Sequence, residues 1–130
     1  MKHLRLWLLL SLLANEGCER LFPHHATSES QAVMQIDKIN RAESTFYRQS
    51  KRFGSLNELG QMGLVSRDIS AGSSAGYRFG IIATTEAYSL TATPEKAEVG
   101  AQRTFYSDQT GIVREGVGSE VATSASPPIK

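Results

Sequence analysis

The clearest pattern in the chain is a helical repeat that begins near Ser28. Buried-type positions recur at spacings of three and four residues through Ala32, Ile36, Ile39, Ala42 or Glu43, and Phe46. This spacing predicts an amphipathic helix of about 25 residues with one core face. Ser28 and Gln31 have the spacing of a capping box at its start, and Gly54 supplies a stop at its end.

A second, shorter helical turn follows the stop. Ser55 can cap Ser55–Leu59, because Glu58 stands at the third position of a capping box. The next stretch, Asp68–Gly76, is rich in glycine and serine and is predicted to be a loop.

Alternation of apolar and polar side chains then replaces the helical repeat. The runs Tyr77–Thr84 and Ala87–Thr93 alternate with a period of two, and Pro94 ends the second run. Thr85 and Glu86 leave only a tight connection between the runs. We therefore predict an antiparallel hairpin.

The last structured stretch is predicted to be a second hairpin. Its strands are Arg103–Ser107 and Ile112–Arg114. Asp108 suits the first position of the connecting turn, and Gly111 can adopt a positive φ. A long helix followed by a small antiparallel meander of roughly three or four strands predicts an α+β fold, with the helix on one face of the sheet.

The two ends of the chain differ from this middle part. Residues 1–18 have a basic start and a short apolar segment over 6–14, which is typical of an export signal and shorter than the about 20 residues that span a bilayer. Residues 19–27 are predicted to be a linker and 28–115 the folded domain. Residues 116–130 are small, polar and proline-terminated, so we expect a disordered tail.

The single cysteine, Cys18, lies at the end of the signal-like segment, just past its apolar part. A cysteine at this place is the lipid acceptor of bacterial lipoproteins. Gly17 fits that pattern, whereas Asn15 and Glu16 depart from it. Two interpretations stay open: lipidation at Cys18, or an ordinary signal cleaved near Ala14 or a little later that leaves Cys18 as a free thiol.

Charge and histidine placement disfavour two function classes. Residues 28–115 carry ten basic and ten acidic side chains, which cancel, whereas nucleic-acid binding normally needs a basic stripe. All three histidines (His3, His24 and His25) precede the predicted helix, which disfavours a Ser–His or Cys–His enzyme.

The remaining candidate sites are weak. Adjacent residues such as His24 and His25 do not usually direct both rings to one metal ion. Asp108 alone is a poor start for calcium, which takes six to eight oxygens. Residues 72–76 lack the lysine and hydroxyl residue of a phosphate-binding loop. The acidic side chains are scattered and are interpreted as solvated charges, so we predict no catalytic residue, metal or cofactor.

The order of these motifs resembles a known family. The helix carries "INRAESTFYRQSKRFGSLNEL", and "GYRFGI", "AYSLTATP" and "RTFYSDQTGIVRE" follow it. Over about 36–115 the chain resembles the globular domain of type IV pilin-like proteins, including the type II secretion pseudopilins. The resemblance implies the head-domain fold and a structural role for the Asp108–Gly111 turn. It does not extend to 1–18, which differ from the processed start and long apolar helix of pilins.

Together these features predict an exported, non-enzymatic, pilin-like domain of the bacterial cell envelope that acts through protein–protein contacts, as an accessory to a type IV pilus or type II secretion apparatus. It is either held at a membrane, for example as an outer-membrane lipoprotein, or released into the periplasm. An alternative is a free-standing envelope lipoprotein or periplasmic binding module without a filament role. A third is a small hydrolase or hydrolase inhibitor; the enzyme version would need a cleft of convergent carboxylates with raised pKa values.

Overall fold

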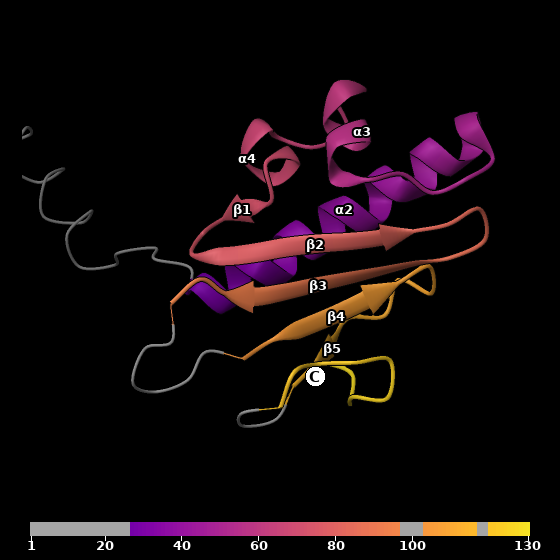
Figure 1. Cartoon of the computed structure of the whole chain (residues 1–130). Helices are drawn as coiled ribbons and strands as arrows, with labels where there is room; N and C mark the ends of the chain where they lie inside the picture. Colours follow the sequence, from indigo (N-terminus) through magenta and orange to yellow (C-terminus); the bar gives the residue numbers. More distant parts are fainter. Residues whose placement is uncertain (1–26, 97–102, 117–119) are drawn as a thin grey trace, which may run out of the picture.

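The computed structural model describes residues 27–96, 103–116 and 120–130. Three helices precede a five-stranded antiparallel sheet: α2 (Ser28–Ser50), α3 (Leu56–Gln61), α4 (Arg67–Ser70), β1 (Ser73–Ser74), β2 (Tyr77–Ala83), β3 (Tyr88–Pro94), β4 (Phe105–Asp108) and β5 (Arg114–Glu115). The strands are neighbours in chain order, from β1 to β5. Helix α2 packs across one face of this sheet, and α3 and α4 lie on the side of its β1 and β2 strands (Figure 1). The predicted α+β class is confirmed. The sheet has five strands where three or four were predicted, and the two-residue β1 is the additional one.

Helix α2 begins and ends close to the predicted positions but uses other residues. Thr27 rather than Ser28 is the N-cap, and its hydroxyl accepts a hydrogen bond from the Ser30 N–H at 3.2 Å. At the other end Lys51 adopts the left-handed conformation, with φ of 57°, and donates its N–H to the Tyr47 carbonyl at 2.8 Å. Gly54 is therefore not the stop. It is buried beside Phe46, where an added Cβ would lie 3.0 Å from the ring.

The segment after α2 is more regular than predicted. The Ser55 capping box forms as predicted, because the Ser55 hydroxyl accepts from the Glu58 N–H and the Glu58 carboxylate accepts from the Ser55 N–H, both at 3.1 Å. The predicted loop over 68–76 instead contains most of α4 and all of β1. Helix α4 forms here because Ser66 caps it and Ile69 enters the core.

The sheet register follows from the predicted alternation. In the β2–β3 hairpin Phe79 pairs with Ala92, and in the β3–β4 pair Leu90 lies opposite Ser107. Because successive side chains of a strand point to opposite faces, these residues share the face that α2 covers. The buried core on this face includes Ile36, Ile39, Phe46, Leu59, Tyr77, Phe79, Leu90 and Phe105.

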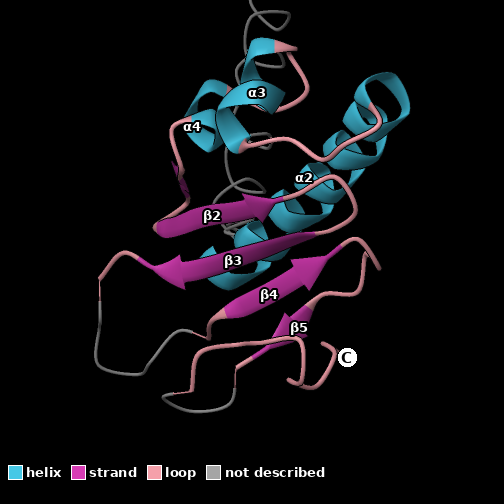
Figure 2. Ribbon diagram, turned by 45° about the vertical axis from the view of Figure 1, so that its right-hand side comes forward, coloured by secondary structure: helices cyan, strands magenta, loops and turns pink. Residues whose placement is uncertain are grey.

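The C-terminal segment 120–130 differs from the expected disordered tail, because it lies against the sheet beyond β5 (Figure 2). Ile129 donates its N–H to the Val113 carbonyl at 3.0 Å, and Glu115 donates its N–H to the Pro127 carbonyl at 2.9 Å. Ala122 is only 3% exposed. The composition argument considered the segment alone, whereas its few apolar side chains extend a core that the sheet has already formed.

Candidate functional site

Polar side chains are buried where α2 meets the sheet. Asn40 and Glu43 lie on α2 three residues apart, so they occupy the same helix face, and Ser107 of β4 is buried with them. Buried polar groups destabilise a fold unless they find hydrogen-bond partners. The hydrogen-bond partners of each group therefore decide whether its burial is compensated.

Both polar ends of the Asn40 amide are hydrogen-bonded. Its side-chain N–H₂ donates to the Ser107 hydroxyl at 2.9 Å, and its carbonyl oxygen accepts from the Tyr88 hydroxyl at 2.6 Å. Ser107 in turn donates to the Ile112 carbonyl at 2.9 Å. This chain of bonds connects α2 to β3, β4 and the closing turn, and burial raises the pKa of the Tyr88 phenol above its ordinary value.

Glu43 is only half bonded. Its side chain is 0% exposed, and its Oε2 accepts the Gly54 N–H at 2.9 Å. Its Oε1 has no hydrogen-bond partner in the part of the chain that the structure describes. Burial raises the pKa of Glu43 from 4.5 to about 7, against the opposing effect of the Gly54 N–H. The acidic residues were interpreted as solvated, although Glu43 was also an alternative in the helical repeat; the interpretation is wrong for Glu43, because residue 43 faces the core.

A second carboxyl nearby shows the opposite shift. The Arg52 guanidinium forms an ion pair with Glu58 and lies 5.1 Å from the centre of the Phe46 ring. Hydrogen bonds from the Arg52 guanidinium, and next from the Ser55 N–H, lower the pKa of Glu58 to about 2. Arg52 also lowers the pKa of Glu43, but only as the smallest of four effects. The arginine is therefore engaged with the exposed carboxylate and not with the buried one.

Two carboxyls with divergent pKa values are a common sign of acid–base catalysis. Here the carboxyl with the raised pKa is enclosed, and a general acid must lie within hydrogen-bond reach of its substrate. The pair therefore lacks the access that a hydrolase site requires in this conformation.

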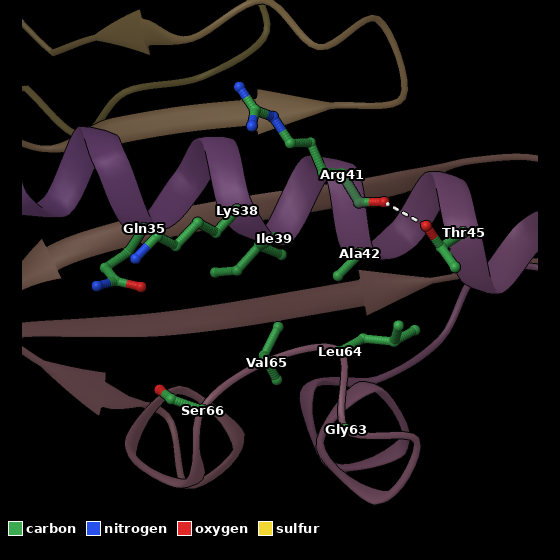
Figure 3. Close-up of a pocket in the computed structure, with 10 residues that line it drawn as sticks. All are labelled: Gln35, Lys38, Ile39, Arg41, Ala42, Thr45, Gly63, Leu64, Val65 and Ser66. Carbon is green, nitrogen blue, oxygen red and sulfur yellow. Dashed lines mark hydrogen bonds between the residues drawn. The ribbon is translucent and has the colours of Figure 1, made fainter.

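An open groove runs between α2 and residues 63–66. Its volume is about 550 Å³, within the range of small ligand sites. Figure 3 shows Ile39 and Ala42 of the helix facing Leu64 and Val65 of the loop. The groove is lined by Gln35, Lys38, Ile39, Arg41, Ala42, Thr45, Gly63, Leu64, Val65 and Ser66.

The charge of the groove has one sign. Its two charged lining residues, Lys38 and Arg41, are both basic, and neither forms an ion pair with the described residues. Figure 3 shows the Lys38 side chain beside Gln35, whereas Arg41 points away from the 63–66 loop. Sequence analysis did not single out this groove. Only the apolar pair Leu64 and Val65 after a short helix could have indicated that the chain folds back here.

The residues singled out from the sequence lie elsewhere. In the closing turn Gly111 has φ of 75° and donates its N–H to the Asp108 carbonyl at 2.9 Å. The Asp108 carboxylate accepts the Thr110 N–H at 3.0 Å, so this side chain is used within its own turn. The predicted export signal with Cys18, the 19–26 part of the linker, and the histidines lie outside the described residues.

None of the helices in the described part of the chain combines the length and apolar character needed to cross a membrane. No group of three or more potential metal ligands occurs among the same residues. Comparisons with protein families, with curated proteins and with solved structures found no match.

Proposed function

We propose that this chain is an exported, non-enzymatic protein whose pilin-like domain acts through protein–protein contacts in the bacterial cell envelope. The proposal rests on the motif order over 36–115 and on the export-type sequence at 1–18. It is supported by a long helix laid on an antiparallel meander that closes with the Asp108 turn.

The observation that carries a contact function is the groove beside α2. It combines an apolar floor with two basic side chains that have no ion-pair partner among the described residues. Such a surface suits a partner segment that inserts an apolar side chain and places a carboxylate near Lys38; Arg41, which points away from the 63–66 loop, can meet a second carboxylate only beyond the rim of the groove. Glu43, by contrast, is enclosed and is not offered to a ligand.

The proposed partners are components of a type IV pilus or a type II secretion apparatus. A photo-reactive amino acid at Thr45 samples the groove, and one at Gln49, one turn later and exposed on the same helix, is the matched control. We expect an envelope protein to be cross-linked from Thr45 but not from Gln49. Equal cross-linking from both positions, or none from Thr45, would contradict contact through the groove.

A free-standing envelope lipoprotein or periplasmic binding module is the second candidate. Gly17 and Cys18, which lie just past the apolar segment, favour the lipoprotein version. Intact mass of the protein from the membrane fraction separates the forms, because a chain that begins at Cys18 with added acyl mass is a lipoprotein. A groove partner unrelated to pili or secretion would favour this candidate over the first.

A further inference from the structure

The half-bonded carboxyl of Glu43 lies under a short connecting segment. Residues 51–54 leave the end of α2, and the Gly54 N–H of this segment donates to the Glu43 carboxyl. Phe53 of the same segment packs against two other aromatic rings. Its ring centre lies 4.8 Å from that of Tyr47 and 4.9 Å from that of Tyr88.

The segment connects α2 to α3 and lies outside any helix or strand. Lys51 donates its N–H to the Tyr47 carbonyl, Phe53 donates its N–H to the Thr84 carbonyl at 3.2 Å, and the Phe53 carbonyl accepts from the Arg52 guanidinium at 3.3 Å. A connection outside regular secondary structure can open locally without unfolding the domain. Such an opening would admit water to Glu43 without moving α2 or the sheet.

Ionised Glu43 would lack a counter-charge in the closed arrangement. The charged and titratable groups that act on it are Arg52, Glu58 of α3 and the phenol of Tyr88. Arg52 is bonded to Glu58, and the Tyr88 hydroxyl donates to Asn40. Because a buried and unpaired carboxylate is strongly unfavourable, ionisation favours any arrangement that admits water to Oε1.

We propose that Glu43 is a proton-controlled latch: with its proton bound, segment 51–54 closes over the carboxyl, and loss of the proton opens this segment. In the closed state the carboxyl accepts the Gly54 N–H. In the open state water solvates the carboxylate, and Arg52 can turn from Glu58 toward Glu43. The proton goes to solvent, and α2 and the sheet stay in place.

The direction of the pH dependence follows from linkage. Glu43 has a higher pKa in the closed state than when solvated, so the closed state binds its proton more tightly. The stabilisation of the closed state is complete below pH 4.5, decreases from there to about pH 7, and stays low above that value. Over this window the opening equilibrium changes by about tenfold per pH unit at most.

Hydrogen exchange of the full chain tests the latch. Peptides covering 51–55 are followed at pH 5 and pH 7.5, with rates corrected for the intrinsic pH dependence of exchange. We expect opening of the native protein to rise by roughly tenfold or more, and Glu43→Gln to remove most of that rise. The same pH dependence in both proteins, or none in the native protein, would overturn the proposal.

Two controls test whether other side chains cause the pH dependence. Glu58→Gln removes a carboxyl from the same cluster and should leave the rise in opening in place. His24→Gln with His25→Gln, made in both backgrounds, removes the two histidines of the predicted linker. A ¹³C titration of the Glu43 carboxyl gives an answer independent of any variant, because a midpoint near 4.5 would also overturn the latch.

Discussion

Asn40 and Glu43 occupy the same face of α2, one turn apart, and both are buried against the sheet. Asn40 is bonded on both sides by Ser107 and Tyr88, whereas Glu43 has one bonded and one unpartnered oxygen. The amide does not titrate, whereas burial raises the pKa of the carboxyl to about 7. Two buried polar groups therefore act differently. The bonded Asn40 amide fixes the position of α2 on the sheet, and the Glu43 carboxyl makes the free energy of unfolding depend on pH.

The first and largest prediction concerns Glu43→Gln. The folded-state pKa is about 7 against 4.5 for the solvated group, so the native protein loses stability as pH rises between these values. We expect the variant to match the native protein near pH 4.5 and to be more stable by up to about 3 kcal/mol at pH 7.5. Urea unfolding at both pH values measures the difference.

A gain of equal size at both pH values would contradict the assignment, because it would reflect packing and not ionisation. A loss of stability at pH 7.5 would show that the carboxylate is compensated in the folded protein.

The second prediction tests the bonded side of the comparison. Asn40→Ala leaves the Tyr88 hydroxyl without its acceptor and opens a small cavity, so we expect a loss of about 2.5 kcal/mol in the free energy of unfolding. The loss should be the same at pH 5 and pH 7.5, because no titrating group changes. Asn57→Ala, an exposed asparagine on α3, is the matched control and should change stability by less than about 0.5 kcal/mol.

Tyr88→Phe is the third and milder test of the same network. It removes one donor and keeps the ring, which packs on Phe53. We expect a loss of about 1.5 kcal/mol, since the Asn40 carbonyl oxygen is left unpaired. Combining this change with Asn40→Ala measures the coupling; additive losses would mean that the two side chains do not act as one network.

Local patterns predicted most of the fold. The three- and four-residue repeat from Ala32 to Phe46 predicted α2 because its apolar face packs on the sheet, and the alternation after Gly76 predicted the β2–β3 hairpin. Cap positions were less accurate, since Thr27 and Ser28 are both good caps. The same repeat included Glu43. Because the acidic side chains were interpreted as solvated, the burial of the Glu43 side chain was not predicted.

Long-range contacts account for the rest. The 63–66 loop lines the groove only because α3 turns the chain back toward α2, and no residue pattern within the loop encodes that return. Likewise, the 120–130 segment gains its partners from β5 and Val113. Composition describes a segment by itself and cannot include a surface that other parts of the chain provide.

The smallest effect is expected from Glu58→Gln. Glu58 holds Arg52 in an ion pair, yet it lies at the surface, where solvent screens that pair. The glutamine keeps an oxygen that can accept the Ser55 N–H of the capping box. We expect the urea midpoint to move less than in the Glu43, Asn40 and Tyr88 variants, and equally at pH 5 and pH 7.5, because the pKa of Glu58 is already about 2. A pH-dependent change in this variant would mean that Glu58 itself raises the pKa of Glu43 appreciably, or that Arg52, once released, compensates Glu43 in the closed state. In either case, burial alone would not explain the difference between the two carboxyls.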